Sequence, residues 1–328
     1  MAAAVIFPQS RRAGGRMILR VLAWLGRHGT ALMALGIVAG LAAPPLAHFL
    51  APTLPPLIFL VTVATMLRLD WPQVLEHARR PHRIALVVAW SLLVTPLVMT
   101  LAARVFNLPQ SLAQAMVLWA ASPPMMSLPA IAYLLGLDGA LALVVMVSGT
   151  LLMPLTLPPL VFGLTGIDTG IGVLPLMARL AMFVGATVLI ASALRRFIGP
   201  ERLQRRSDEL NGLNVLLLVA FAVAVMDGMW SRIAQDPWNV LFYAFSAIAA
   251  GVLMQALSFA AFSWLDRPSS LTIALIGGNK NMAIVWASLA GATSRDLMLF
   301  FACLQLPIYL LPAALAPIYR RLGARTAQ

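Results

Sequence analysis

Charged residues, cysteine and lysine are all scarce in this sequence. Of its 328 residues, 10% are charged and 61% are hydrophobic, with a mean hydropathy of +0.90. Soluble domains carry about 25% charged and about 45–50% apolar residues, so this chain has too few polar groups to cover a surface in water. That shortage excludes a cytosolic enzyme, a nucleic-acid-binding protein and a disordered scaffold. The lone cysteine, Cys303, cannot form a disulfide within the chain. The composition indicates an all-α protein with several membrane spans.

The sequence contains several long runs of apolar residues. A membrane-spanning helix needs roughly 20 mostly apolar residues, so a chain of this length has room for about ten. We therefore predict ten transmembrane helices, near residues 30–50, 55–67, 84–103, 110–135, 139–163, 172–194, 212–229, 238–265, 269–291 and 296–319.

Arginine is unevenly distributed among the predicted loops. Lys and Arg total 23 against 11 Asp and Glu, a net charge of +12. With the N-terminus inside, 18 basic residues fall in inner segments and three, Arg104, Arg232 and Arg295, in outer ones; Arg179 and Lys280, within helices, complete the 23. Short basic loops stay on the cytoplasmic side, so we expect both termini to be cytoplasmic. Because arginine so outnumbers lysine, as in GC-rich bacterial genomes, we expect a bacterial inner membrane.

The even number of helices divides the chain into two halves of five. Because five is odd, the second half must be inverted in the membrane relative to the first. We predict a cytoplasmic N-terminal segment (1–29), a first five-helix repeat (30–163), an extracytoplasmic link (164–171), an inverted second five-helix repeat (172–319) and a cytoplasmic tail (320–328).

The fourth predicted helix of each half is interrupted. In the first half, Pro123, Pro124 and Pro129 stand inside an apolar stretch, and a proline within a helix costs about 3 kcal/mol or more. In the second half, Gly-Gly-Asn-Lys-Asn at 277–281 separates two apolar stretches. Irregular backbone at membrane depth survives only when it is buried in protein or lines a polar cavity. Broken helices at matching positions predict the substrate site of a secondary transporter; the alternative is that proline and glycine are simply common in membrane helices.

Lys280 is the only lysine and lies near the middle of the ninth predicted helix, 11 residues after Ser269 and 14 before Ser294. A charge at the membrane centre costs roughly 2.5–3.5 kcal/mol on insertion scales, so this side chain needs a partner. One interpretation is that its ammonium binds an anionic solute and couples its transport. The other is that backbone carbonyls at the helix break satisfy it.

Polar groups beside the two breaks complete the predicted substrate site. They are the amides of Asn279 and Asn281, the hydroxyls of Ser122 and Ser127, and the bare backbone of Gly277 and Gly278. Ser122 can equally hydrogen-bond to its own helix. Four scattered histidines and no carboxylate in mid-helix provide no catalytic cluster. We therefore predict a protein that is not an enzyme, with no cofactor and no metal site, whose partners are a small organic anion and the lipid bilayer, and not nucleic acid.

Two stretches resemble the bile acid:sodium symporter family. The run from Ser122-Pro123 through Tyr133, then Asp138, Ala140-Leu141, Thr150-Leu151-Leu152 and Pro154, is similar to that family's helices four and five; Gly278-Asn279-Lys280-Asn281 and the apolar helix after it are similar to helix nine. The resemblance implies ten helices in a panel and a core domain, with helices four and nine crossing where they unwind. It also implies alternating access for organic anions, usually coupled to sodium.

The positions at which this family coordinates sodium differ here. The resemblance places its helix-four serine and asparagine at Leu128 and Pro129, its helix-five hydroxyls near Ala142 and Met146, its helix-nine glutamate near Ile276 and the following amide at Lys280. Most of the oxygens are gone and a positive charge has been added, so we expect the Lys280 ammonium to substitute for the cation. Transport would then be sodium-independent, either proton-coupled or facilitative. The alternatives are a sodium-coupled symporter, in which a shift of one or two residues restores Ser122, Ser127 or Asn281 as ligands, and a solute sensor on a transporter fold.

Overall fold

The computed structural model describes residues 19–22, 24–26, 28–69, 74, 81–167, 170–289 and 294–324. Over these residues the chain is helical, and its only extended pairing is one isolated β-bridge. The helices in chain order are α2 (Gly29–Ala42), α3 (Pro44–Leu50), η1 (Ala51–Thr53), α4 (Leu54–Leu67), α6 (Pro81–Ala89), η2 (Trp90–Val94), α7 (Thr95–Val105), α8 (Gln110–Ala121), α9 (Leu128–Leu134), α10 (Gly139–Thr165), α11 (Val173–Ile198), α12 (Pro200–Arg205), α13 (Ser207–Ala224), α14 (Met229–Gln235), α15 (Pro237–Ala261), α16 (Arg267–Gly278), α17 (Met282–Ser288) and α18 (Arg295–Ala324). The predicted all-α class is confirmed. Most of the predicted N-terminal segment, residues 168 and 169 of the predicted link and the last four residues of the predicted tail lie outside the described part.

Six stretches of the described chain are long and apolar enough to cross a membrane. They are Pro44–Leu67, Pro81–Val105, Gly139–Thr165, Val173–Ile198, Ser207–Gln235 and Pro237–Ala261. The prediction of a multi-pass membrane protein is therefore confirmed. The two interrupted stretches, α8 with α9 and α16 with α17, are not among the six, because each break divides a helix into pieces of 12 and 7 residues. The count of ten spans and the inverted repeat remain predictions.

Prolines place one helix boundary differently from the sequence prediction. The predicted break between residues 50 and 55 is wrong: α2 ends at Ala42, and a new helical stretch runs from Pro44 to Leu67. Proline has no N–H with which to continue a helix, and its fixed φ suits the first helical position. The pair Pro44-Pro45 therefore ends one helix and starts the next.

Three helices are preceded by an aspartate that caps their first turn. Asp138, Asp236 and Asp266 precede α10, α15 and α16, and each carboxylate accepts a hydrogen bond from the backbone N–H three residues later. A side-chain oxygen at this position satisfies one of the unpaired donors of the first turn. Few carboxylates are present in this chain, and three of them fix where helices start.

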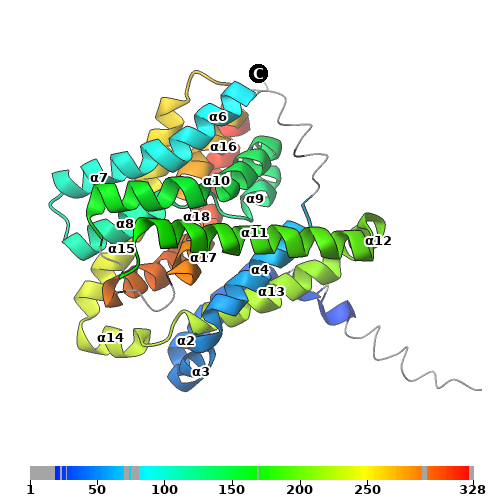
Figure 1. Cartoon of the computed structure of the whole chain (residues 1–328), viewed down its shortest axis with the longest axis horizontal. Coiled ribbons are helices and arrows are strands. Elements are labelled where there is room, and N and C mark those ends of the chain that lie inside the picture. Colours follow the sequence, from blue (N-terminus) through cyan, green and yellow to red (C-terminus); the bar gives the residue numbers. More distant parts are fainter. Residues whose placement is uncertain are drawn as a thin grey trace, which may run out of the picture.

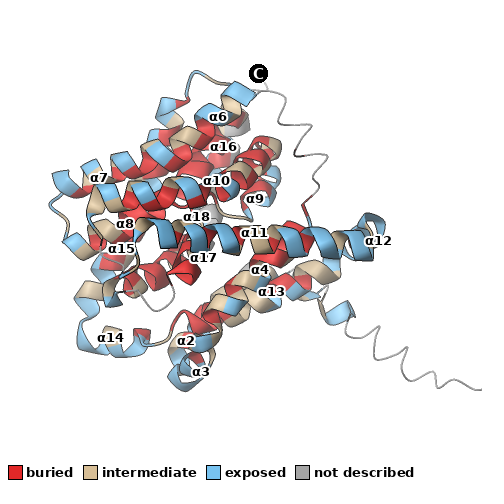
Figure 2. Ribbon diagram, viewed as in Figure 1, coloured by how far each residue is buried: buried red, intermediate tan, exposed pale blue. Residues whose placement is uncertain are grey.

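The helices form two groups that contact each other along α10 and α11 and at α17 (Figure 1). In one group α2, α3 and α4 pack on α13, and α4 also packs on α11. In the other, α8 packs on α7, α10 and α18, while α15 packs on α16 and α18. Between the groups, α10 packs on α11, and α17 contacts α4 and α11. Figure 2 shows the buried residues gathered on the facing sides of these helices and exposed ones on the outer sides of α7 and α11.

Candidate functional site

The two interrupted helices meet at their breaks. Pro124 and Lys280 form the isolated antiparallel bridge, flanked by two backbone hydrogen bonds: Met125 N–H donates to Asn279 O at 2.9 Å and Asn281 N–H donates to Pro123 O at 2.7 Å. A buried polar backbone group without a partner is costly, and here each break supplies partners for the other. The predicted interruptions of both helices are therefore present and are brought together, 156 residues apart in the sequence when counted from Pro124 to Lys280.

The side chain of Lys280 is fully buried beside this crossing, with an exposed fraction of 0%. Its Nζ donates to Ser91 O at 2.6 Å, to Ser91 Oγ at 2.8 Å and to Thr95 Oγ1 at 3.3 Å. An ammonium has three N–H donors, so all three have an acceptor. Neither ion pair found among the described residues includes Lys280. One interpretation of the sequence is that backbone carbonyls at the helix break satisfy this lysine. A backbone carbonyl does accept from it, but that carbonyl belongs to Ser91, on another helical stretch.

Helix geometry explains why the Ser91 carbonyl can accept from Lys280. The Trp90–Val94 segment is π-helical, and the N–H of Thr95 bonds to Trp90 O instead of Ser91 O. The next residue that could donate to Ser91 O along the helix is Pro96, which has no N–H. The Ser91 carbonyl is thus free of the backbone ladder and points its lone pairs at other donors.

Thr95 links three elements at the same point. Its hydroxyl lies 2.7 Å from Ser91 O and 3.0 Å from Ala120 O at the end of α8, and it accepts from Lys280. Thr95 and Ser91 are both 0% exposed. The crossing of the broken helices is therefore fastened to the Pro81–Val105 stretch through Lys280 and Thr95.

The other predicted polar site residues are distributed unequally. Asn279 is buried and its side-chain N–H donates to Leu275 O at 2.9 Å. Ser122 is fully buried and donates to Leu118 O at 2.9 Å, the bond to its own helix that was the alternative interpretation. Asn281 is half-buried and Ser127 is exposed. Only these last two of the four have side chains that a solute can reach in this conformation.

The predicted glycines and prolines shape the crossing. A Cβ on Gly277 would lie 2.1 Å from Ser258 Oγ, and one on Gly278 would lie 2.4 Å from Gly251 O, so both glycines allow α16 to approach α15 closely. Pro123 and Pro124 lie in the non-helical stretch, whereas Pro129 is the second residue of α9, where a proline is well tolerated. Pro129 thus starts the second half-helix and does not itself interrupt the first.

Five of the six positions that the resemblance assigns to sodium ligands, all except Lys280, are apolar and buried. Leu128, Ala142 and Ile276 each have an exposed fraction of 0% and belong to one hydrophobic cluster. Met146 is 1% exposed and Pro129 is buried. Within the described part of the chain, no three His, Cys, Asp or Glu side chains come together as a metal site.

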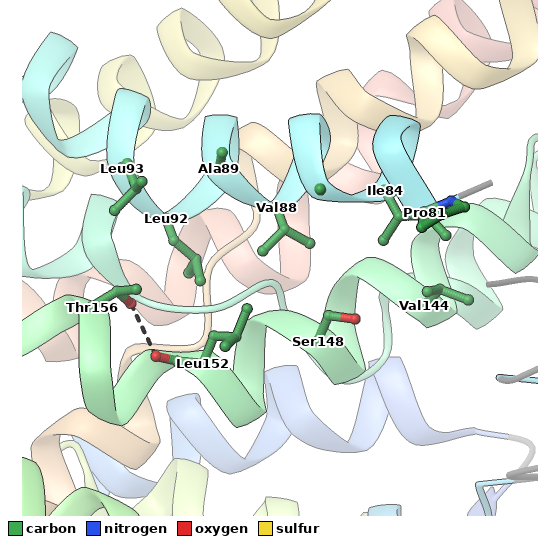
Figure 3. Close-up of a pocket in the computed structure, with 11 residues that line it drawn as sticks. Pro81, Ile84, Val88, Ala89, Leu92, Leu93, Val144, Ser148, Leu152 and Thr156 are labelled. Atoms are coloured by element: carbon green, nitrogen blue, oxygen red, sulfur yellow. Dashed lines mark hydrogen bonds between the residues drawn. The ribbon is translucent and has the colours of Figure 1, made fainter. Parts of the chain in front are cut away.

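An apolar groove of about 400 Å³ runs between the Pro81–Val94 stretch and α10 (Figure 3). Ile84, Val88 and Leu92 form one wall, and Val144, Ser148 and Leu152 form the other. Leu92 follows Ser91 in the sequence, and Ser91 accepts hydrogen bonds from Lys280. The groove therefore runs beside the helical stretch to which the Lys280 side chain is hydrogen-bonded. None of the predicted substrate-binding residues lines this groove.

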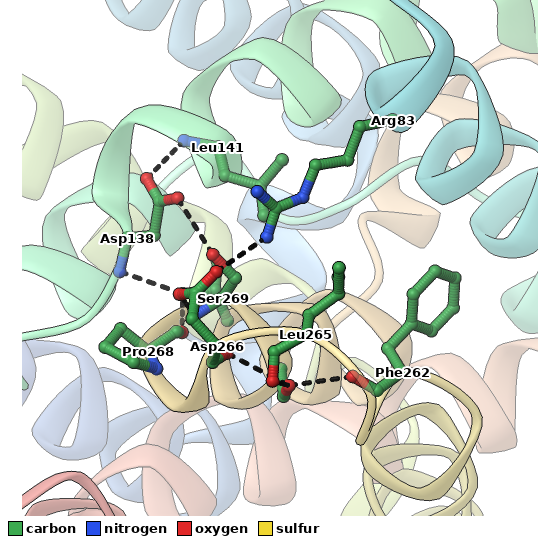
Figure 4. Close-up of polar contacts among 10 residues, drawn as sticks. Arg83, Asp138, Leu141, Phe262, Leu265, Asp266, Pro268 and Ser269 are labelled. Carbon is green, nitrogen blue, oxygen red and sulfur yellow. Dashed lines mark hydrogen bonds and ion pairs between the residues drawn. The ribbon is translucent and has the colours of Figure 1, made fainter. Parts of the chain in front are cut away.

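A polar network joins the starts of α6, α10 and α16 (Figure 4). Arg83 Nη2 lies 2.9 Å from Asp266 Oδ1, and Ser269 Oγ donates to Asp138 Oδ2 at 3.3 Å. Partial burial raises the pKa of Asp266, but hydrogen bonds from Ser269 and Arg83 outweigh it and leave the pKa below its usual value. This network fixes the ends of three helices relative to one another on one side of the crossing.

Ser91 and Thr95 were missed by the sequence analysis. Two hydroxyl residues four positions apart share one face of a helix, and here Pro96 follows directly and weakens the helix at that face. This pattern in an apolar helix was the available signal. It marks a face that offers oxygens, but it does not identify the donor, which is 189 residues away from Ser91.

Comparison with known proteins finds a family match over one part of the chain. Residues 55–202 match the family model described as Sodium Bile acid symporter family. This region runs from α4 to α12 and includes the α8–α9 break, while the α16–α17 break lies beyond it. No curated protein matches the chain. The resemblance predicted from the sequence is confirmed over this region, which is similar to a family whose members are transporters.

Proposed function

We propose that this protein moves a small organic anion across a bacterial inner membrane by alternating access, without sodium, and that the Lys280 ammonium takes the place of the coupling cation. The proposal includes ten spans in two inverted repeats, with both termini cytoplasmic. It involves no chemical conversion of the solute.

One observation carries this proposal. The ammonium of Lys280 is held by a carbonyl and two hydroxyl oxygens beside the crossing of the broken helices. Neutral oxygens of this kind also surround alkali metal ions, whereas the positions of the family's own sodium ligands are filled by Leu128, Ala142 and Ile276. A fixed positive charge thus stands beside three positions whose side chains offer no oxygen to a mobile cation.

The solute site in this proposal lies at the crossing. Because the three donors of Lys280 are occupied, its charge attracts the anion through space in this conformation and does not contact it. Charge acts strongly over such distances where water is excluded. Direct contact falls to Asn281 and Ser127, whose side chains are accessible, while Ser122, Asn279, Gly277 and Gly278 shape the backbone around the site.

Uptake into proteoliposomes tests the proposal. Purified protein is reconstituted, and uptake of a panel of labelled organic anions is measured with sodium chloride and with choline chloride on both sides. We expect an anion whose initial rate changes less than twofold between the two salts, and no uptake in empty liposomes.

Other outcomes would replace the proposal with a stated alternative. A steep dependence on sodium would mean a sodium-coupled symporter. Saturable binding of an anion to the protein with no flux would indicate a solute sensor. Repeating the sodium-free assay with and without an imposed pH gradient separates proton coupling from facilitated transport.

A further inference from the structure

We propose that the apolar groove between the Pro81–Val94 stretch and α10 holds one acyl chain of a membrane phospholipid, whose headgroup lies at the Pro81 end of the groove. The inference concerns a bound lipid and not the transported solute, so it goes beyond the proposed function. It holds whichever solute the protein carries.

The groove lies in the part of the molecule that crosses the membrane. Both walls belong to stretches that are long and apolar enough to span it, Pro81–Val105 and Gly139–Thr165. Among the lining residues Leu92 is 1% exposed, whereas Leu93 and Leu152 are 40% and 42% exposed, so the groove opens to the outside. The core of a bilayer contains no water, and lipid is therefore the molecule that meets this opening.

Small side chains create the width of the groove. Ala85 and Ala89 line one wall and Ser148 lines the other. Protein interiors contain few voids larger than a water molecule, and a groove of about 400 Å³ is far larger than that. Larger side chains at these three positions would close it, so the sequence leaves room here for a ligand.

The length of the groove suits one acyl chain. Figure 3 shows Pro81 at one end and Leu93 with Thr156 at the other. The lining residues extend from Pro81 to Leu93 on one wall and from Val144 to Thr156 on the other. At about 1.5 Å per residue, each wall covers about 18 Å along its helix. The chains of one leaflet cover half of the hydrocarbon core, about 15 Å, so an extended chain fits along the groove.

The lining favours a hydrocarbon chain over an organic anion. Nine of the eleven lining residues are proline, alanine, valine, isoleucine or leucine, and none of the eleven is charged. The other two are Ser148 and Thr156, and the Thr156 hydroxyl donates to Leu152 O at 3.2 Å. A charged group moved from water into such surroundings without a partner is strongly disfavoured. The groove is therefore separate from the proposed solute site.

The position of the groove within the membrane places the headgroup at its Pro81 end. Pro81 begins the Pro81–Val105 span, and Leu93 lies halfway along it, so the groove extends from one membrane surface to the middle. In the sequence, Arg79, Arg80 and Arg83 surround Pro81. Basic residues next to a span attract anionic headgroups. An acyl chain that enters at Pro81 therefore ends beside Leu92 and Leu93.

Photo-crosslinking tests the groove. The protein is reconstituted in vesicles of phosphatidylethanolamine and phosphatidylglycerol with a trace of phosphatidylglycerol that carries a diazirine in one acyl chain. It is then extracted into detergent, which removes loosely held lipid, irradiated, and digested so that adducts can be mapped by mass spectrometry. We expect adducts on residues 84–93 and 144–156. Adducts on the exposed residues Leu174, Met182 and Leu189 of α11 should be at least about fivefold fewer.

The position of the diazirine on the chain tests the orientation. A diazirine near the carboxyl end of the chain should mark Ile84 and Val144, and one near the methyl end should mark Leu93 and Leu152. The reverse order would overturn the placement of the headgroup at Pro81. Adducts spread equally over the groove and α11, or none in the groove, would overturn the site.

Filling the groove should remove its adducts. Ala85 is exposed and lines the groove, so the ring of Ala85→Phe can occupy it without entering the buried core. Ser148→Leu fills it from the opposite wall. Each variant should lower the adducts in the groove at least about fivefold. Ala181→Phe is the matched control, because it adds the same ring at an exposed alanine of α11 and should leave those adducts unchanged. Undiminished adducts in both Ala85→Phe and Ser148→Leu would overturn the proposal.

Discussion

Pro124 and Lys280 pair as an isolated antiparallel bridge, although each belongs to a helix that is otherwise regular on both sides of its break. The pairing requires that both segments be extended where they meet. Proline in the first segment and Gly-Gly-Asn in the second make this extension possible. Lys280 then directs its side chain to Ser91 and Thr95. The backbone of Lys280 thus joins the two broken helices, and its side chain joins them to the Pro81–Val105 stretch.

Replacing Lys280 should stop transport and leave a membrane-inserted protein. In Lys280→Ala, buried oxygens lose their donor, at about 1–3 kcal/mol for each unsatisfied group, and the fixed charge is lost. We expect uptake of a transported anion in choline chloride to fall by at least about tenfold. Lys280→Met keeps the length of the side chain without the charge and should lose as much. Normal uptake by either variant, at equal amounts in the membrane, would show that the ammonium has no part in transport.

Pro96 should matter for transport although it touches no solute. In Pro96→Ala the new N–H allows the Pro81–Val105 stretch to become regularly α-helical, and the Thr95 N–H can then bond to Ser91 O. That carbonyl would turn away from Lys280. We expect an uptake rate several-fold lower with an unfolding midpoint that is unchanged or higher, since proline disfavours a helix interior.

Pro159→Ala is the matched control for Pro96→Ala. Pro159 is also inside a helix, but it is exposed on α10 and lies ten residues from Gly149, where α10 approaches Pro124. Its replacement should leave uptake unchanged. Equal effects of the two substitutions would mean that loss of any helix proline, and not release of the Ser91 carbonyl, sets the rate.

The sequence was sufficient to locate both breaks because their causes are local. Three prolines in seven residues, and glycines followed by amides, disrupt a helix whatever surrounds it. The burial of Lys280 also followed from its position, since a lone charge 11 residues from the start of an apolar stretch is too far from water to remain exposed. The apolar residue types at Leu128, Ala142 and Ile276, which the resemblance matches to sodium ligands, were likewise visible in the sequence.

The partners of Lys280 could not be predicted in the same way. In a soluble protein, hydrophobic periodicity shows which face of a helix packs against its neighbours. In a membrane protein it does not, because a face that meets lipid and a face that meets protein are both apolar. Ser91 and Asp266 each contact a residue more than 180 positions away. Such contacts depend on the arrangement of all the helices, as does the boundary that Pro44 sets between α2 and α3.

Gly278 should tolerate no side chain. A Cβ there would lie 2.4 Å from Gly251 O, a backbone atom that cannot move without shifting α15. Gly278→Ala should therefore cost about 1–3 kcal/mol through overpacking and lower the unfolding midpoint by about 2–10 °C.

Gly185→Ala provides the comparison for Gly278→Ala. Gly185 is also within a helix, α11, but a Cβ there meets nothing within 4 Å. Because alanine is the better helix former by about 0.5–1 kcal/mol, this midpoint should rise slightly. A stable Gly278→Ala protein with normal uptake would show that α15 and α16 need not approach so closely.

The ion pair of Arg83 and Asp266 should give the protein an acid-sensitive component of stability. Asp266 has a pKa below its ordinary value of 3.8 in the folded protein, with hydrogen bonds from Ser269 and Arg83 overcoming the effect of burial. A carboxyl whose pKa is lower when folded than when unfolded contributes stability above the unfolded value and loses it as the pH falls through the folded one. We expect the unfolding midpoint of the wild-type protein to fall as the pH is lowered from about 5 to below 4. Asp266→Asn, which can still cap α16, should start lower at neutral pH and fall less steeply. Arg83→Gln should reduce the slope in the same way, and an acid profile identical in all three proteins would mean that the pair between α6 and α16 does not stabilise the fold.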